Sequence, residues 1–229
     1  MRLYRNFTEA FSEIRRDVKE MGIRVHTQTY QDKFIGDNPD FEQLEVQNYV
    51  YTVTKPLTDD LEPTEPWASA EWEERVSGIL GFPVNPGSAW ELREEVWEEF
   101  LNSQGQFSYT YSDRLSRYNQ VKRVIEGIRE DPASRQLYIS VWDPSDIENI
   151  GGKQRVPCTL GYLVQVRKEQ LNLTYFQRSC DLVTHFENDV FFAHLMQRYI
   201  AFSTGLEVGN YTHFINSLHA FRKDLEGVF

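Results

Sequence analysis

The chain has 229 residues, of which 40% are hydrophobic and 14% aromatic, a composition that excludes a disordered chain and predicts a sizeable core. We expect one globular domain over residues 1–229, since a single core commonly serves about 100 to 250 residues. The formal net charge of −11 argues against binding to nucleic-acid polymers, whose sequence-independent recognition depends on clustered Lys and Arg. A small anionic ligand is compatible with this charge, because a few arginines in a cleft act locally.

The chain has two cysteines, Cys158 and Cys180, and they do not form a Cys-x-x-Cys or Cys/His metal-binding spacing. We therefore expect neither a disulfide scaffold nor a metal site, and a reducing, cytoplasmic compartment is the default. The start MRLYRNFTEAF lacks the apolar segment of a signal peptide. Because no run approaches the roughly 18 apolar residues of a membrane span, we expect a soluble protein.

In the first part of the chain the pattern predicts a helix, a strand and a long loop. Asn6 and Glu9 resemble a capping box, and apolar residues then recur at helical spacing over 7–21. Residues 46–54 alternate and are rich in β-formers, which predicts a strand. Residues 55–88 contain five prolines, and we expect a long surface loop there.

Two further helices are predicted next, over 88–105 with Ser88 and Glu91 as its capping pair, and over 112–131 ahead of Pro132. After Pro132 the period changes to two. Strands are predicted in the segments LYISVW, TLGYLVQV and QLNLTYF, at 137–142, 159–166 and 170–176. The last two are joined by a short polar turn and should form a hairpin, and 190–204 returns to a helical pattern.

Cys158 follows a proline at the mouth of the strand 159–166. The hairpin leads from Cys158 to the segment QRSCD at 177–181, so strand pairing can place both in one cavity. There Arg178 and Ser179 could hold an anion, and Arg178 could favour a thiolate on Cys158. The alternative is that Cys158 is simply a small buried hydrophobic residue.

The segments VPC, QRSCD, NDV and SLHAF, in this order, resemble the catalytic half of the thymidylate synthases and the related pyrimidine nucleotide hydroxymethylases. The resemblance covers about residues 88–221. It implies an α/β (α+β) fold of three layers, in which a mixed sheet is packed by helices and two sheets meet face to face in a homodimer. It also implies kinship to bacteriophage DNA-modification enzymes, which would work in the host cytoplasm.

The resemblance implies that Cys158 adds to C6 of a pyrimidine nucleotide 5′-monophosphate and that C5 then attacks the methylene of 5,10-methylenetetrahydrofolate. The other implied contacts are substrate binding by the QRS segment with Gln177, phosphate binding by Arg178, Ser179 and the partner subunit's Arg135, ribose binding by His219, pterin binding by Asp181, folate packing by Trp97, and an active-site aromatic at Tyr111. Taken singly, Arg135 could instead cap a helix, and His219 and Trp97 could be ordinary core residues.

Asp189 stands where thymidylate synthases carry an asparagine that reads uracil. An ionised carboxylate cannot donate to O4 of uracil, whereas it accepts well from the N4 amino group of cytosine. One proton must then be shared between Asp189 and N3 of cytosine, which burial of the carboxyl would favour. Asp189 therefore points to dCMP, although a register slip of one residue would put Asn188 there instead.

Other positions depart from the family pattern. Gln136 stands at the place of a second phosphate arginine, and Arg24 is a candidate to replace the missing N-terminal phosphate loop. Phe221 replaces a tyrosine that contacts the sugar, which leaves ribose and deoxyribose undecided. Glu71 is the candidate for the glutamate that orders water. Phe229 is a candidate for a shortened closing lid.

From these observations we expect a homodimeric enzyme that converts dCMP to 5-hydroxymethyl-dCMP with 5,10-methylenetetrahydrofolate and without a metal. Cys158 would be the nucleophile and Asp189 would read the base. Three alternatives stay open: a thymidylate synthase acting on dUMP, a dUMP hydroxymethylase, and a catalytically idle nucleotide-binding paralogue. A methyl product forms if the intermediate receives hydride from the folate, and a hydroxymethyl product forms if it receives water. Which of these occurs depends on whether water reaches the site, and the sequence does not decide this.

Overall fold

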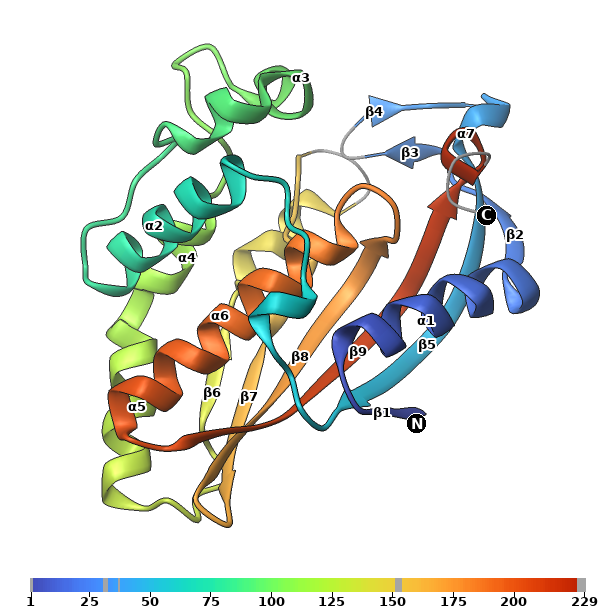
Figure 1. The fold of residues 1–229 in the computed structure, drawn as a ribbon. Helices are drawn as coiled ribbons and strands as arrows, with labels where there is room; N and C mark the ends of the chain where they lie inside the picture. Colours follow the sequence, from blue (N-terminus) through green and yellow to red (C-terminus); the bar gives the residue numbers. More distant parts are fainter. Residues whose placement is uncertain (1, 31–32, 37, 151–153, 226–229) are drawn as a thin grey trace.

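A computed structural model describes residues 2–30, 33–36, 38–150 and 154–225, so the candidate lid residue Phe229 lies outside the described part. Its centre is a seven-stranded mixed sheet in the order β1-β5-β9-β8-β7-β6, with β2 pairing to β5 at the edge (Figure 1). The strands are β1 (Arg2–Tyr4), β2 (Ile23–His26), β5 (Glu42–Val53), β6 (Tyr138–Ser140), β7 (Thr159–Arg167), β8 (Gln170–Asp181) and β9 (Glu207–Phe221). A separate pair consists of β3 (Thr29–Tyr30) and β4 (Lys33–Phe34).

The longest helices, α1 (Phe7–Met21) and α6 (Phe186–Thr204), lie against one face of the sheet (Figure 1). Helix α1 packs on β5 and begins where the Asn6 side chain accepts from the Glu9 backbone N–H, as its capping residue predicts. Helix α6 packs on β8 and β9. The expected fold class, a mixed sheet packed by helices, is confirmed.

Alternate residues of the central strands point into this core, as a half-buried strand requires. On β8 and β9 the inward side chains include Leu173, Tyr175, Tyr211 and Ile215, each at most 1% exposed. The residues that alternate with these and point to the other face of the sheet are only half-buried. Phe176 and Phe214 belong to this second set, and their ring centres lie 6.1 Å apart. A sheet-to-sheet dimer would cover that second face, and it stays a prediction.

The prediction of a continuous loop over 55–88 is wrong, because it contains helix α2 (Trp67–Ile79). The prolines were taken as evidence against a helix, but Pro66 stands at the N-cap of α2. At this boundary a proline removes no helical hydrogen bond. One face of α2 is buried through Trp67, Ala68, Arg75 and Ile79. Two short 3-10 turns, Thr58–Asp60 and Pro39–Phe41, precede it.

Both helices predicted between 88 and 131 are interrupted. The first consists of the 3-10 turns Ala89–Arg93 and Glu98–Phe100 around the short helix α3 (Glu94–Trp97). The second divides into α4 (Tyr111–Ser116), a 3-10 turn (Arg117–Asn119) and α5 (Gln120–Glu130). It breaks because Tyr118 and Asn119 adopt φ of 57° and 49°, in the left-handed region that no helix continues through.

The hairpin of β7 and β8 is confirmed, with Lys168 and Glu169 at positive φ in the tight turn that such hairpins favour. The strand β9 is absent from the predicted elements, and its parallel pairing with β8 brings His219 beside Asp181. A further 3-10 segment, Pro144–Asn149, and the short helix α7 (Arg222–Leu225) complete the elements.

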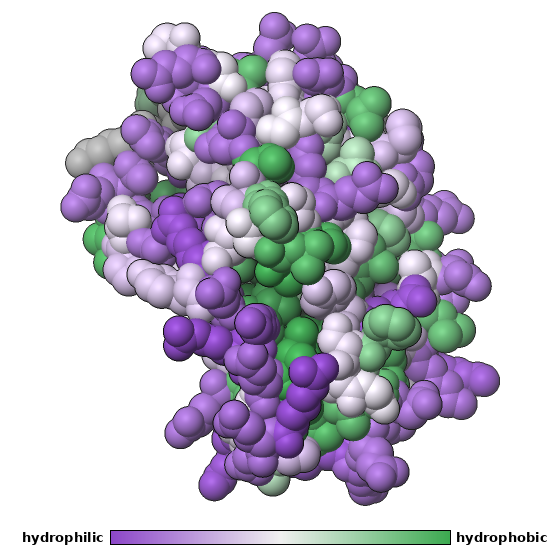
Figure 2. Space-filling model, turned by 90° about the vertical axis from the view of Figure 1, so that its left-hand side faces the viewer, coloured by the Kyte–Doolittle hydropathy of each residue, from purple (hydrophilic) through white to green (hydrophobic). Residues whose placement is uncertain are grey.

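Hydrophilic residues cover most of the side formed by α2, α4 and α5, where hydrophobic residues gather in a central strip (Figure 2). None of the described helices combines the length and the hydropathy needed to cross a bilayer.

Candidate active site

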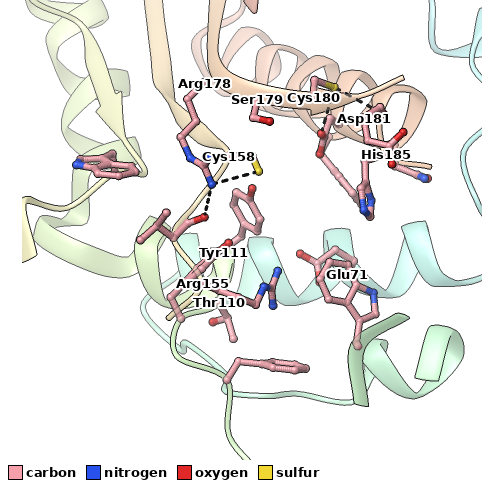
Figure 3. Close-up of a pocket in the computed structure, with 18 of the residues that line it drawn as sticks. Glu71, Thr110, Tyr111, Arg155, Cys158, Arg178, Ser179, Cys180, Asp181 and His185 are labelled. Carbon is pink, nitrogen blue, oxygen red and sulfur yellow. Dashed lines mark hydrogen bonds between the residues drawn. The ribbon is translucent and has the colours of Figure 1, made fainter. Parts of the chain in front are cut away.

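A cavity of about 600 Å³ opens at the end of the sheet where β8 and β9 finish, between the sheet and α2. Figure 3 shows the Cys158 sulfur pointing toward its open centre, with Glu71 on the far side. Nine of the residues predicted to form the site line this cavity: Cys158, Glu71, Asp189, Arg178, Ser179, His219, Tyr111, Trp97 and Asp181. The fold therefore brings motifs that are far apart in the sequence together around one pocket.

Cys158 is held at the start of β7 by backbone pairing with β8, where the Arg178 N–H donates to the Cys158 carbonyl at 2.9 Å. Its thiol is half-buried, and the Arg178 Nη2 lies 3.7 Å from the sulfur. Burial raises the pKa of Cys158, and the Arg178 guanidinium opposes this shift without reversing it. The Arg178 charge thus acts in the direction that favours a thiolate, although desolvation has the larger effect.

The Arg178 side chain is fixed by the loop that precedes Cys158. Its Nε donates to the Pro157 carbonyl at 2.9 Å and its Nη2 to the Val156 carbonyl at 3.0 Å. These bonds place the guanidinium beside the thiol, with Ser179 lining the cavity next to it. Within the described residues Nη1 has no hydrogen-bond acceptor, so it can donate to an anion.

Asp189 lies in the first turn of α6, where its backbone N–H donates to the His185 carbonyl. Its Oδ2 accepts from the Gln177 amide at 2.6 Å and from the Cys180 thiol at 3.8 Å. Burial raises the pKa of Asp189 to about 6, and the bond from Gln177 works in the opposite direction. The neighbouring Asn188 differs, because its amide group both accepts from and donates to Thr64.

Asp189 should lower the stability of the folded protein above pH 6. The folded pKa of about 6 exceeds the unfolded value of 3.8, so the folded state binds the proton more tightly and stability falls as pH rises through this window. The Asp189→Asn variant should match the wild type near pH 4 and exceed it above pH 6, by on the order of 3 kcal/mol. Urea denaturation at pH 4 to 7 measures the difference, and a pH-independent difference would contradict the assignment.

Glu71 lies on α2 and forms an ion pair with Arg75 one turn later, with 2.7 Å between Oε1 and Nε. Arg75 is 5% exposed, and its guanidinium lies 3.9 Å from the ring centres of both Tyr111 and Phe192. These contacts fix the guanidinium and therefore the carboxylate that faces the cavity. Arg75 was not predicted as a site residue, although its i+4 spacing from Glu71 is a visible signal once the segment is taken as a helix.

The remaining predicted cavity residues come from three elements. Asp181 ends β8, and its Oδ1 accepts from the backbone N–H groups of Val183 and Thr184 at 3.0 and 3.2 Å. His219, on β9, is buried, and burial lowers the pKa of its imidazole. Trp97, on α3, stacks on Trp67 with ring centres 6.2 Å apart.

Three predicted site residues lie outside the cavity lining. Gln177 is fully buried behind Asp189. Arg24 belongs to β2 and points to solvent, with 77% of its side chain exposed and Glu42 as an ion-pair partner at 3.5 Å, so it does not replace a phosphate loop within this chain. Arg135 is exposed in the segment before β6, and its donation to a partner subunit stays a prediction.

Two further lining residues were missed by the sequence prediction. The Arg155 guanidinium lies 4.8 Å from the Trp97 ring centre and 4.5 Å from that of Phe100. Its place three residues before Cys158 was the available signal. His185 occupies the N-cap position of α6 without a side-chain capping bond and contacts Trp97, and burial lowers the pKa of its imidazole to about 4.

Among residues 2–30, 33–36, 38–150 and 154–225, no group of three or more His, Cys, Asp or Glu side chains is arranged to hold a metal ion.

Comparisons with known proteins agree with this geometry. The family model described as thymidylate synthase matches residues 69–229. The thymidylate synthase of Symbiobacterium thermophilum is 34% identical over 48% of this chain and 41% of its own length. That of Lactococcus lactis subsp. cremoris is 30% identical over 58% of this chain and 48% of its own. The chain thus spans about half the length of these curated relatives.

The fold also matches a solved structure, the thermostable thymidylate synthase A from Bacillus subtilis, with a TM-score of 0.73 at 20% sequence identity. The match covers 97% of this chain and 82% of the other. At this level of identity it supports the fold and leaves the substrate to be argued from the site.

Proposed function

Because the chain belongs to the thymidylate synthase family, we propose that it transfers a one-carbon unit to C5 of a pyrimidine nucleotide 5′-monophosphate, and that it converts dCMP to 5-hydroxymethyl-dCMP. The observation that carries the proposal is that the Cys158 thiol and the Asp189 carboxyl line one cavity. We take residues 1–229 as a single catalytic domain.

Cys158 acts as the nucleophile. Its sulfur forms a bond to C6 of the base, the C5–C6 double bond is lost, and C5 becomes nucleophilic. C5 takes the one-carbon unit, and loss of the C5 proton with release of tetrahydrofolate leaves an exocyclic methylene. Water adds to this methylene, and departure of the Cys158 thiolate from C6 restores the C5–C6 double bond. The Arg178 guanidinium at 3.7 Å stabilises the sulfur whenever it carries negative charge.

Asp189 selects cytosine. A carboxyl that accepts from N4 and shares a proton with N3 matches the edge of cytosine, and a pKa raised to about 6 keeps such a proton accessible near neutral pH. Uracil would place the O4 lone pairs against an ionised oxygen. The firm binding of Asn188 to Thr64 favours Asp189 over Asn188 as the base-reading residue.

The cavity walls suit a flat folate. The indole N–H groups of Trp90 and Trp97 are buried without a hydrogen-bond partner among the described residues, and both rings line the cavity. Trp97 would hold the folate by stacking and Asp181 would bind the pterin. When bound, 5,10-methylenetetrahydrofolate supplies the one-carbon unit.

Water that completes the hydroxymethyl group would be ordered by Glu71, whose carboxylate is held at the cavity by Arg75. His219 would contact the sugar, Tyr111 would support the base site, and Arg178 with Ser179 would bind the phosphate. We further propose a homodimer, in which Arg135 of one subunit reaches the phosphate of the other, and a cytoplasmic location.

The test is incubation of the purified protein with 5,10-methylenetetrahydrofolate and either dCMP or dUMP, followed by mass spectrometry of the nucleotide. We expect dCMP to gain the mass of a hydroxymethyl group. A product from dUMP alone would instead support a thymidylate synthase or a dUMP hydroxymethylase. If neither nucleotide reacts or forms a covalent adduct in its 5-fluoro form, the protein is an idle paralogue.

A further inference from the structure

A chain of three fully buried polar side chains stands behind the Asp189 carboxyl. The Gln177 amide N–H donates to Asp189 Oδ2 at 2.6 Å, and the Gln177 Oε1 lies 3.0 Å from His213 Nε2. The other ring nitrogen of His213, Nδ1, lies 3.2 Å from the Tyr51 hydroxyl. Tyr51, Gln177 and His213 are each 0% exposed, so water does not satisfy these groups.

When Asp189 is ionised, the direction of every bond in this chain is determined. The carboxylate only accepts, so the amide N–H of Gln177 must face it and the amide oxygen must face His213. His213 therefore donates from Nε2. Because the ring is buried and neutral, Nδ1 carries no proton and accepts from the Tyr51 hydroxyl.

The reversed direction is disfavoured by Tyr51. Reversal requires a proton on Asp189 Oδ2, a turned Gln177 amide and a His213 that donates from Nδ1 to the Tyr51 oxygen. The Tyr51 O–H would then lose its acceptor inside the core, where a buried polar group without a partner lowers the population of that state by about tenfold or more. A proton held by Asp189 therefore belongs on Oδ1, which receives no hydrogen bond from the described residues.

The position of this proton matters because a neutral carboxyl group can pair with either cytosine or uracil. With one oxygen donating and the other accepting, it can pair with the N3 and N4 of cytosine, or, with the roles exchanged, with the N3–H and O4 of uracil. A proton that moves freely between Oδ1 and Oδ2 would therefore recognise both bases. Fixing it on one oxygen makes the carboxyl specific.

We propose that Tyr51 and His213 are specificity-determining positioning residues, which act through Gln177 to keep the proton of Asp189 on Oδ1 and so separate dCMP from dUMP. The inference deepens the proposed function and rests on it for the identity of the two bases. It explains why a tyrosine and a histidine occupy inward positions of β5 and β9 that would otherwise suit apolar side chains.

The test is Tyr51→Phe, with Tyr211→Phe as its matched control. Tyr211 is also 0% exposed, but its hydroxyl has no hydrogen-bond partner among the described residues. Without the Tyr51 hydroxyl, both directions of the hydrogen-bond chain leave Nδ1 of His213 without a partner. The preference for a proton on Oδ1 of Asp189 is then lost. The ratio of kcat/KM for dCMP to that for dUMP should fall by about tenfold in Tyr51→Phe and stay unchanged in Tyr211→Phe. A Tyr51→Phe enzyme with the wild-type ratio would overturn the inference.

A second measurement does not depend on activity. The ¹⁵N spectrum of histidine-labelled protein, with the His213 signal assigned by its loss in His213→Phe, should show protonation at Nε2 in the wild type and a mixture of tautomers in Tyr51→Phe. Protonation of His213 at Nδ1 in the wild type would refute the proposed direction of the hydrogen bonds. If the wild type prefers dUMP, the proposed function fails, but the inference still predicts that Tyr51→Phe brings the ratio nearer to one.

Discussion

Replacing Cys158 by serine should lower kcat at least about a thousandfold, because removal of a nucleophile commonly costs that much or more. The serine hydroxyl is a far weaker nucleophile at neutral pH than a thiol, and the Arg178 guanidinium 3.7 Å from the sulfur cannot compensate. The folate-dependent release of tritium from C5 of labelled dCMP measures the loss directly.

The matched experiment uses the second cysteine. Cys180 is 2% exposed, and burial raises the pKa of its thiol well above the usual range, so it should not act as a nucleophile. With 5-fluoro-dCMP and 5,10-methylenetetrahydrofolate, Cys180→Ala should still form a covalent adduct that mass spectrometry locates on Cys158, whereas Cys158→Ser should form none. An adduct in Cys158→Ser would show that another residue attacks C6.

The location of the site was predictable because it depends on short-range order. Cys158 and Arg178 lie on the two strands of one hairpin, and a hairpin with a tight turn fixes its own register. Glu71, the candidate for the glutamate that orders water, lines the cavity although its segment was assigned to a loop, and its role stays a prediction. Arg24 does not reach the site, because it lies on the edge strand β2, three of whose four residues are exposed, and no local pattern of charges reveals this.

The strand β9 shows why other parts could not be predicted. Two of its inward residues, Tyr211 and His213, have polar atoms, so the alternation that marks a half-buried strand is hidden. The break at Tyr118 is hidden for the opposite reason, since apolar residues continue at helical spacing across it. The inward position of His213 depends on tertiary contacts, because Gln177 and Tyr51 satisfy its ring.

Asp189→Asn should move the preference from dCMP toward dUMP by about a hundredfold. Two contacts to the base change character: the asparagine amide donates to O4, and its oxygen accepts from N3–H, while cytosine now meets mismatched groups. Each mispaired buried polar group costs about 1 to 3 kcal/mol, so two of them give a factor of this size. Competition between dCMP and dUMP in one reaction, resolved by mass spectrometry, gives the ratio of kcat/KM values.

The control for this exchange is the neighbouring residue. Asn188 is 5% exposed and its amide is engaged by Thr64, so Asn188→Ala should lower stability without changing the base that is preferred. If instead Asn188→Ala shifts the preference and Asp189→Asn does not, the base is read one residue earlier and the argument for cytosine is lost. The two outcomes are opposed because Gln177 donates to Asp189 and, among the described residues, not to Asn188, so the experiment identifies which of these two side chains on α6 reads the base.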